Sequence, residues 1–394
     1  MTVLKSLRTS ESVTEGHPDK VADRISDAVL DAVFKGDRAA HVACETFLTT
    51  GLVIVGGEIT TKSYVDLPAL VRRVISDIGY DRPGHGFHFQ DCAVLSAIKE
   101  QSSDIQTAVN RAAGKSRESR DRGNSLGAGD QGIVFGYARS DTETLMPLPI
   151  HLAHRLAQRM AELRKDGTLP FLLPDGKTQV TVEYEGERPR RVHTVLLAAQ
   201  HEASVKQSVL QRALDEHVVR PVLGPWADTK THVLVNTSGR FVIGGPASDS
   251  GVTGRKIIVD TYGGFAPHGG GAFSGKDPTK VDRSGSYMAR YVAKNLVAAG
   301  LAREAEVEIA YAIGRPDPLA VRVNAHGTGA VSNDRLREAV LETFDLRPEP
   351  IIRKLQLLAR LYEPLSAYGH FGRPDLDLTW ERTDAIGALQ KAAR

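Results

Sequence analysis

The segment from Gly263 to Arg283, GGFAPHGGGAFSGKDPTKVDR, combines glycines with lysines and aspartates. Glycines let backbone N–H groups approach an anion closely, lysines supply positive charge for phosphate, and carboxylates bind the magnesium that accompanies it. Gly270, Gly275 and Lys276 have the spacing of a P-loop, but Asp277 stands where that motif needs a serine or threonine hydroxyl. The segment therefore predicts a polyphosphate site that is not an ordinary P-loop.

A second group of polar residues, His17-Pro18-Asp19-Lys20, opens an amphipathic segment. Proline suits the first turn of a helix, and a helix N-terminus attracts anions through its free N–H groups and its dipole. A histidine, an aspartate and a lysine gathered there can handle a phosphate with its metal ion. The simpler interpretation, which we favour for this tetrapeptide taken alone, is an ordinary helix cap with an acidic first turn.

Two glutamates, Glu45 and Glu58, lie within the apolar segments VACETFL and LVIVGGEIT, which a turn at Thr50-Gly51 joins. In a two-residue hairpin these glutamates fall on the same face in diagonal positions. Buried carboxylates need a cation or several donors, so the pair can bind a metal ion or a substrate ammonium group. Solvent-facing carboxylates on the two strands are equally compatible with the sequence.

Two further glycine-rich turns carry charged residues. Residues 127–132, GAGDQG, match the dinucleotide motif G-x-G-x-x-G, but no strand precedes them and a strand, not a helix, follows. We therefore reject a dinucleotide fold and keep Asp130 as a ligand contact. The other turn, SDSGVTGRK, brings Asp249 close in sequence to Arg255 and Lys256, which suits a nucleotide, although such turns are common.

Length and composition restrict the class of protein. The 394 residues suffice for two or three domains with cores of their own. A formal charge of +2 gives no general attraction to nucleic acid or to membranes, and no apolar run approaches the length of a membrane span. With two cysteines and no signal-peptide core at the N-terminus, we expect a cytoplasmic protein without a disulfide framework.

Hydrophobic periodicity predicts the elements that position these residues. We expect helices after His17, after Asp66, at 150–165, at 204–219, at 284–299 and from Ser332. The expected strands are 42–49, 52–60, 91–98, 131–138, 178–184, 192–199, 231–235, 255–260, 306–312 and 318–324.

Each third of the chain follows a β-α-β-β-α order, and the adjacent strand pairs favour mixed or antiparallel sheets. We therefore predict an α+β fold of three similar units around one centre. The expected domains are an N-terminal one at 1–110, a central one at 120–240 and a C-terminal one at 241–394.

Together these motifs resemble the S-adenosylmethionine synthetase (methionine adenosyltransferase) family. The resemblance extends over nearly the whole chain, from TSESVTEGHPDK through GAGDQG and GGGAFSGKDPTKVDRS to YGHFGR. It implies three β-α-β-β-α-β domains around a pseudo-threefold axis. It also implies an enzyme that transfers the adenosyl group of ATP to the sulfur of L-methionine and then hydrolyses the tripolyphosphate to pyrophosphate and phosphate.

The resemblance assigns roles to individual residues. The catalytic residues would be His17, which stabilises the leaving oxygen, with Lys177, Arg255 and Lys276. ATP would contact His17, Asp130, Asp175, Lys177, Arg240, Phe241, Asp249, Arg255, Lys256, Ala272 and Lys276. Methionine would contact Glu58, Gln101, Asp249 and Lys280. Two Mg²⁺ ions per site would be bound by Asp19 and Asp282, and one K⁺ ion by Glu45.

The resemblance further implies a homodimer with shared active sites, or a dimer of dimers that forms a homotetramer. His17 and Lys276 would come from one chain, and Lys177, Asp249 and Arg255 from the other. The nearly continuous apolar strands around the two glutamates also suggest burial on both faces, against helices and against the same sheet across a twofold axis. Burial between domains of one chain is the alternative. Residues from about 101 to 111 would form the family's mobile gating loop.

Two other functions compete with this one. The first is a phosphotransferase that moves the γ-phosphoryl group of ATP through its glycine–lysine loop. Asp277 and the absence of a strand before Gly270 count against it. The second is a nucleotide sensor that binds without catalysis, for which two metal-type aspartates beside several cations are more than binding requires.

Overall fold

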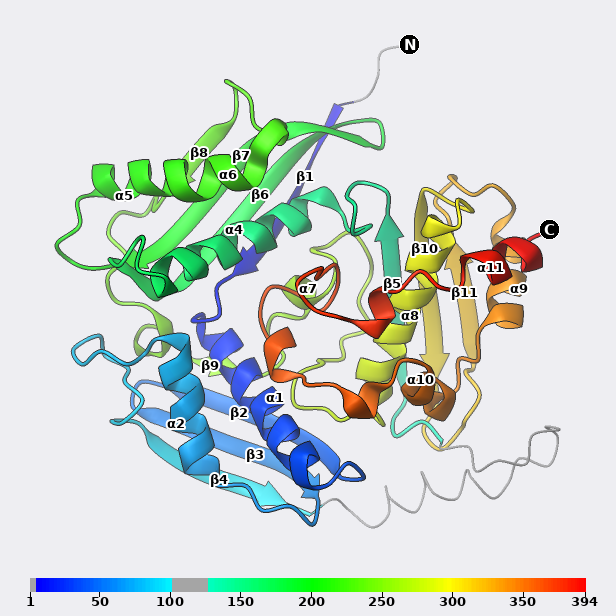
Figure 1. Cartoon of the computed structure of the whole chain (residues 1–394), viewed down its shortest axis with the longest axis horizontal. Helices are drawn as coiled ribbons and strands as arrows, with labels where there is room; N and C mark the ends of the chain where they lie inside the picture. Colours follow the sequence, from blue (N-terminus) through cyan, green and yellow to red (C-terminus); the bar gives the residue numbers. More distant parts are fainter. Residues whose placement is uncertain (1–4, 101–126) are drawn as a thin grey trace.

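The computed structural model describes residues 5–100 and 127–394, and their strands form three sheets (Figure 1). The first sheet has the order β4-β3-β2-β9, the second β1-β6-β7-β8 and the third β11-β10-β5. The strands are β1 Lys5–Val13, β2 His41–Thr49, β3 Leu52–Thr60, β4 Ala93–Lys99, β5 Gly132–Arg139, β6 Leu172–Glu185, β7 Arg188–His201, β8 His232–Val235, β9 Gly251–Val252, β10 Glu304–Tyr311 and β11 Ala320–Asn324. The predicted α+β class is confirmed.

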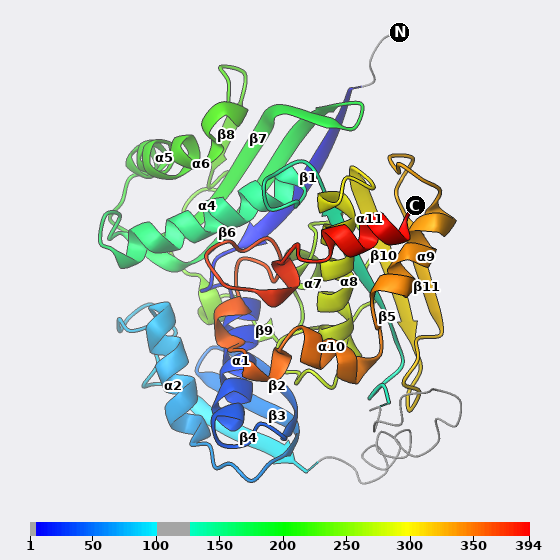
Figure 2. The same ribbon diagram turned by 45° about the vertical axis from the view of Figure 1, so that its right-hand side comes forward.

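Helices cover the sheets on one side. The described α-helices, of which α10 and α11 pack on other helices, are α1 Pro18–Gly36, α2 Leu67–Ile78, α4 Leu148–Lys165, α5 Gln207–Leu214, α6 Arg220–Leu223, α7 Ile257–Asp260, α8 Val281–Ala298, α9 Asn333–Thr343, α10 Pro348–Lys354 and α11 Ile386–Ala392. α1, α4 and α8 each pack on a different sheet and face the middle of the molecule, where α7 lies (Figures 1 and 2). Within the described ranges no helix has the length and apolar character that crossing a membrane requires.

The three sheets do not follow three consecutive segments of the chain, because each segment gives a strand to another sheet. β1 pairs antiparallel with β6, β5 with β10, and β9 with β2. The donated strand lies each time beside the first strand of a hairpin, which is β6–β7, β10–β11 or β2–β3. The exchange runs from the first segment to the second, from the second to the third, and from the third back to the first.

One predicted strand is wrong, and two strands, β1 and the two-residue β9, were missed. Residues 255–260 were expected as a strand, but they include the helical turn α7. The Asp260 N–H donates to the Lys256 carbonyl at 2.8 Å, and the buried Asp260 carboxylate pairs with Lys20, so tertiary contacts override a locally β-branched sequence. β1 was missed because its sequence, KSLRTSESV, is mostly polar.

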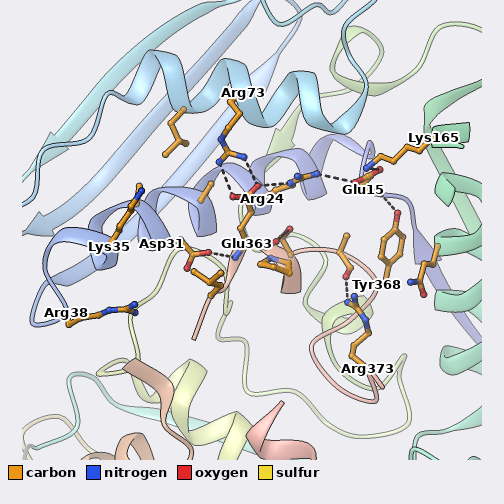
Figure 3. A pocket seen from close by; sticks show the side chains of 18 residues that line it. Glu15, Arg24, Asp31, Lys35, Arg38, Arg73, Lys165, Glu363, Tyr368 and Arg373 are labelled. Atoms are coloured by element: carbon orange, nitrogen blue, oxygen red, sulfur yellow. Dashed lines mark hydrogen bonds and ion pairs between the residues drawn. The ribbon is translucent and has the colours of Figure 1, made fainter. Parts of the chain in front are cut away.

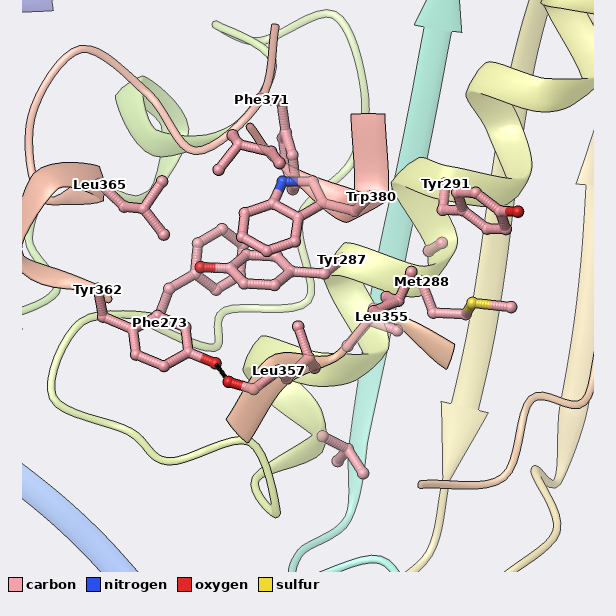
Figure 4. Close-up of a cluster of buried hydrophobic side chains, with 14 of the residues drawn as sticks. Phe273, Tyr287, Met288, Tyr291, Leu355, Leu357, Tyr362, Leu365, Phe371 and Trp380 are labelled. Atoms are coloured by element: carbon pink, nitrogen blue, oxygen red, sulfur yellow. Dashed lines mark hydrogen bonds between the residues drawn. The ribbon is translucent and has the colours of Figure 1, made fainter. Parts of the chain in front are cut away.

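Aromatic side chains of the core pack around Phe273, which belongs to the glycine–lysine segment (Figure 4). The rings of Tyr287 and Trp380 stack with centroids 4.1 Å apart, and Phe273 meets Tyr287 edge-on at 5.5 Å. The Trp380 Nε1–H donates to the His370 carbonyl at 2.9 Å. Full burial of a phenylalanine side chain contributes roughly 2–3 kcal/mol, so Phe273 is a strong anchor within the segment.

Candidate active site

His17 caps helix α1. Its Nδ1 accepts a hydrogen bond from the N–H of Asp19 at 3.2 Å, and Pro18 occupies the first helical turn. His17 is 4% exposed and Asp19 2%. The simple interpretation of the HPDK tetrapeptide as a helix cap is therefore confirmed, and the same cap buries an imidazole and a carboxylate at the positive end of a helix.

The His17 imidazole is suited to donate a hydrogen bond to an anion. Because Nδ1 accepts a hydrogen bond, the proton of the neutral ring lies on Nε2. Burial lowers the pKa of His17 to about 3, and the charges of Lys256 and Lys177 act in the same direction. The ring is thus neutral near pH 7 and can donate Nε2–H to an oxygen on which negative charge develops.

Asp19 lies among cations from a distant turn. Its Oδ2 lies 2.6 Å from Lys256 Nζ, and its Oδ1 lies 3.8 Å from the Arg255 guanidinium and accepts the Val252 N–H at 3.1 Å. Burial alone would raise the pKa of Asp19, but the hydrogen bonds from Lys256 and Val252 lower it below its usual value. Asp19 is therefore an ionised carboxylate beside two cations, as a phosphate–metal site requires.

Lys20, which the sequence grouped with this site, turns away from it. Its side chain is fully buried, lies 2.9 Å from Asp23 Oδ2 and also pairs with Asp260. Burial opposes its charge, yet the two carboxylates raise the pKa of Lys20 above its usual value. Lys20 is thus a structural cation, and the interpretation of it as a phosphate ligand is wrong.

Asp175, on β6, extends this group. Its Oδ2 accepts the Gly245 N–H at 2.8 Å, whereas its Oδ1 is buried and has no hydrogen-bond partner in the described part of the chain. Burial raises the pKa of Asp175 to about 6; the charge of Lys177 lowers it and that of Asp249 raises it, so both residues lie near. An unpartnered buried acceptor beside a surface turn suits a ligand that donates a hydrogen bond.

The loop after β8 joins the same group through Gln200. Gln200 Oε1 accepts the Asp175 N–H at 3.2 Å, and its amide donates to the Val242 carbonyl at 3.0 Å. Phe241 is half-buried beside it, and the exposed Arg240 donates to the Ala203 carbonyl at 2.8 Å. We call the resulting set the helix-cap group: His17, Asp19, Asp175, Lys177, Arg240, Phe241, Asp249, Arg255 and Lys256.

A second set of candidate residues gathers around Lys276. Lys276 Nζ lies 2.7 Å from Asp282 Oδ2. A Cβ at Gly271 would lie 2.3 Å from Cγ of Asp282, and one at Gly132 would lie 3.3 Å from its Oδ1. The two glycine motifs that the sequence singled out therefore meet at one carboxylate, because glycines leave room for it.

The glycine–lysine segment also pairs with β2 of the first sheet. Lys276 forms an isolated antiparallel bridge with Ala43, and Ala43 lies opposite Glu58 in the β2–β3 pairing. The register also sets Glu45 opposite Gly56, so Glu45 and Glu58 share a face in diagonal positions, as predicted. We call the set that this pairing supports the glycine-loop group: Glu45, Glu58, Ala272, Lys276, Lys280 and Asp282.

Asp277 explains why this loop is not a P-loop. It is 1% exposed, and its carboxylate accepts hydrogen bonds from the Val42 N–H at 2.7 Å, the Thr279 N–H at 2.8 Å and Lys280 Nζ at 2.8 Å. α8 begins only at Val281, so no helix follows Lys276 directly. The residue that departs from the motif is a structural anchor, and the phosphotransferase alternative loses its support.

The remaining candidates are more exposed or outside the described residues. Asp130 is exposed, and its Oδ1 accepts the N–H of the following residue at 2.7 Å. Glu45 is exposed, and Glu58 lies 3.4 Å from Lys99 Nζ. Gln101 and the predicted gating loop lie outside the described residues.

The predicted division of the site between two chains is wrong for His17. His17 was expected beside Lys276 and apart from Lys177, but its charge neighbours include Lys177 and Lys256 of its own chain, while Lys276 pairs with Asp282. The helix-cap group and the glycine-loop group of one chain also approach each other. A Cβ at Gly254, which precedes Arg255, would lie 2.5 Å from the Cβ of Ala272.

The described residues contain no cluster of three or more histidine, cysteine or acidic side chains that could hold a metal ion alone. Asp19 and Asp282 instead stand singly, each beside a lysine. This arrangement fits Mg²⁺, which protein sites bind through one or two carboxylates together with substrate phosphates and water.

A separate cavity of about 720 Å³ lies beside α1. It is lined by ion pairs such as Arg24–Glu363 and by none of the predicted site residues (Figure 3).

Comparison with known proteins covers nearly the full chain. Models of the N-terminal, central and C-terminal domains of S-adenosylmethionine synthetase match residues 5–103, 125–241 and 243–382. The chain is 58% identical over 389 residues to the S-adenosylmethionine synthase of Desulforudis audaxviator, covering 98% of each protein. It is 57% identical over 398 residues to the S-adenosylmethionine synthase of Thermus thermophilus, covering 99% of this chain and 100% of the relative.

Proposed function

Because the chain belongs to the S-adenosylmethionine synthetase family, we propose that it transfers the adenosyl group of ATP to the sulfur of L-methionine. The observation that carries the proposal is the helix-cap group, in which a neutral His17 and an ionised Asp19 lie with Arg255 and Lys256 at a helix N-terminus. Such a set suits a polyphosphate with its metal ion.

The reaction is a displacement at an ordinary primary carbon. A lone pair of the methionine sulfur forms the S–C5′ bond while the C5′–O bond breaks, and the electron pair of that bond leaves with the triphosphate. Water then cleaves the tripolyphosphate into pyrophosphate and phosphate. A thioether is an uncharged nucleophile, so positioning and the stabilisation of charge on the departing oxygen must supply most of the acceleration.

The chain's cations would serve that departing oxygen and the phosphates behind it. Nε2–H of His17 would donate to the oxygen at C5′, since the neutral ring carries its proton there. Lys177, Arg255 and Lys256 from the helix-cap group and Lys276 from the glycine-loop group would hold the phosphate oxygens. Removal of a single such donor typically costs ~10²–10³-fold in rate.

The two substrates would be recognised by the remaining candidates. The unpartnered Oδ1 of Asp175 suits a donor group of the nucleoside, with Arg240, Phe241 and Ala272 lining it. Glu58, Gln101 and Lys280 would contact methionine, with Asp130 and Asp249 contacting adenosine or the methionine amino group. Lys280 must be shared with Asp277, because their side chains lie 2.8 Å apart.

Two Mg²⁺ ions would be held by Asp19 and Asp282 together with phosphate oxygens, and K⁺ by Glu45. When bound, the divalent ions would neutralise negative charge on the polyphosphate.

Cys44 and Cys92 are both buried free thiols, which supports a reducing compartment, and we place the enzyme in the cytoplasm.

We also propose a homodimer that shares its sites, paired further into a tetramer. The face of the first sheet that α1 and α2 leave open carries Glu45 and Glu58 together with Phe47, which is 38% exposed, and Leu95, which is 52% exposed. An open apolar face with acidic residues supports packing against a second copy across a twofold axis. The cyclic exchange of β1, β5 and β9 supports three pseudo-threefold domains near 1–110, 120–240 and 241–394.

Product analysis tests the activity. Purified enzyme given ATP and methionine should form one pyrophosphate and one phosphate for each S-adenosylmethionine, measured by ³¹P NMR and chromatography. Formation of ADP would favour a phosphotransferase, and tight ATP binding without turnover would favour a sensor.

A further inference from the structure

Helix α1 carries an aspartate at every fourth position: Asp19, Asp23, Asp27 and Asp31. Residues four apart lie one above the other on the same side of a helix. Each of the four carboxylates accepts a backbone N–H from a segment more than 200 residues away in sequence. The helix therefore holds distant segments in a fixed order along its length.

Asp23 holds the turn that carries two cations of the helix-cap group. It is fully buried, its Oδ1 accepts the Gly254 N–H at 2.8 Å, and its Oδ2 accepts Lys20 Nζ at 2.9 Å. Gly254 directly precedes Arg255 and has a φ of +79°, which glycine adopts without strain; because glycine also has many other conformations open to it, the hydrogen bond to Asp23 fixes one of them. Lys20 in turn bonds Asp260, which ends the helical turn after that arginine.

Asp27 holds the glycine loop in the same way. Its Oδ1 accepts the Gly275 N–H at 2.8 Å, and both of its oxygens accept hydrogen bonds from the Arg283 guanidinium at 2.8 Å. Arg283 also donates to the Lys276 carbonyl at 2.9 Å. Asp27 and Arg283 are completely buried, so this pair is an internal support that does not face solvent.

Asp31 is the matching carboxylate at the far end of the row. It accepts the Tyr362 N–H at 2.8 Å and the Glu363 N–H at 2.8 Å beside the cavity described above (Figure 3). Glu363 continues to Arg24 and Arg73, and neither belongs to the candidate site. Asp31 therefore fixes a segment of the fold without fixing a candidate phosphate ligand.

We infer that Asp23 and Asp27 are positioning residues for triphosphate, each fixing one cationic loop through a backbone N–H and a buried cation. The inference rests on the proposed roles of Arg255, Lys256 and Lys276. These cations belong to two groups, and neighbouring turns of α1 bond the backbone of both loops. Asp23 and Asp27 thus each fix one loop that carries a proposed triphosphate ligand.

The test compares Asp23→Ala with the control Asp31→Ala, using magnesium tripolyphosphate as the substrate. We expect the KM for tripolyphosphate to rise at least ~10-fold in Asp23→Ala, because small displacements of positioning groups can cost up to ~10²-fold. The value for Asp31→Ala should stay within about 2-fold of the parent, even if its melting temperature falls. Asp23→Asn, which keeps a carbonyl acceptor, should recover part of the loss.

Asp27 needs a variant that does not strand a buried charge, since removal of one partner of such a pair strongly destabilises a protein. The double variant Asp27→Leu/Arg283→Met removes both charges and replaces them with two apolar side chains. We expect the same rise in KM there, and a smaller one in Asp27→Asn/Arg283→Gln, which keeps the acceptor for Gly275. Amide hydrogen exchange should quicken at Gly254 in Asp23→Ala and at Gly275 in the apolar double variant.

The inference is overturned if Asp23→Ala and the apolar double variant lose only thermal stability, with KM values for tripolyphosphate like that of Asp31→Ala. Faster exchange at Gly254 with an unchanged KM would also overturn it. Failure of the proposed function is a separate result, because the parent enzyme itself would then form no S-adenosylmethionine from ATP and methionine.

Discussion

The ammonium of Lys256 lies 2.6 Å from Oδ2 of Asp19, although 237 residues separate the two in sequence. One is a proposed triphosphate ligand and the other a proposed magnesium ligand. Magnesium and triphosphate would each compete with this ion pair for one of its partners, so their binding must be coupled. A change at either residue should therefore alter the dependence on both ligands.

Asp19→Asn and Asp282→Asn should each raise the magnesium concentration needed for half-maximal activity by ~10-fold or more, the scale on which metal sites respond to the loss of a supporting group. Magnesium titrations of the initial rate measure this. Asp77→Asn removes an exposed carboxylate from a surface ion pair and serves as the control. Unchanged magnesium dependence in both site variants would show that these carboxylates are not the ligands.

Lys276→Met keeps most of the side chain's length and removes its charge. We expect kcat to fall by at least ~10²-fold, because the variant lacks one donor to the departing triphosphate. Steady-state kinetics give the value, and Lys391→Met, at an exposed lysine of α11, is the matched control. Activity within a few-fold of the parent would remove Lys276 from the mechanism.

The buried imidazole of His17 should make stability depend on pH. Burial, with Lys256 and Lys177, lowers the pKa of His17 to about 3, whereas an unfolded chain has a histidine pKa of about 6.5. Between these values the unfolded chain binds more protons, so this contribution to stability is complete above pH ~6.5 and is lost as pH falls.

His17→Asn lacks this contribution. The difference in unfolding free energy between parent and variant should therefore grow from pH ~5 to pH ~6.5, by at most about 1.4 kcal/mol per pH unit, and level off at higher pH. Urea unfolding curves at several pH values measure it. A difference that does not change with pH would mean that His17 titrates normally in the folded chain.

Mixed dimers test the sharing of sites. If each site joins the helix-cap group of one chain to the glycine-loop group of the other, then Lys177→Ala and Lys276→Met chains should restore activity when reassembled together. One site of each mixed dimer would contain both lysines. His17→Ala with Lys177→Ala should stay inactive, because both residues belong to the helix-cap group. Confirmed hetero-dimers of the first pair without activity would contradict shared sites.

Local sequence patterns predicted the elements that carry the site. The period of apolar residues gave α1 and α8 to within a few residues, and the Thr50-Gly51 turn gave the register that places Glu45 and Glu58 on one face. These features depend on neighbours in sequence. A four-residue period of aspartates in α1 was also visible, but its meaning lies in the distant N–H groups that it binds.

The features that the sequence analysis did not predict correctly depend on tertiary contacts. β1 is polar and is a strand because β6 of another segment pairs with it, and residues 257–259 are helical although their β-branched sequence, IIV, favours a strand. Lys177 was expected beside His17 only from a second chain, whereas it reaches His17 within one chain from 160 residues away. Sequence patterns report local preference, and these contacts are not local.

The most direct test of the account uses ATP that carries ¹⁸O in the bridge between C5′ and the α-phosphorus. Attack of methionine sulfur at C5′ breaks the bond between carbon and this oxygen. We therefore expect the label to leave with the polyphosphate, and mass spectrometry should find it in pyrophosphate or phosphate. Label retained on a nucleoside product, with ADP formed, would show cleavage at phosphorus and would contradict the account.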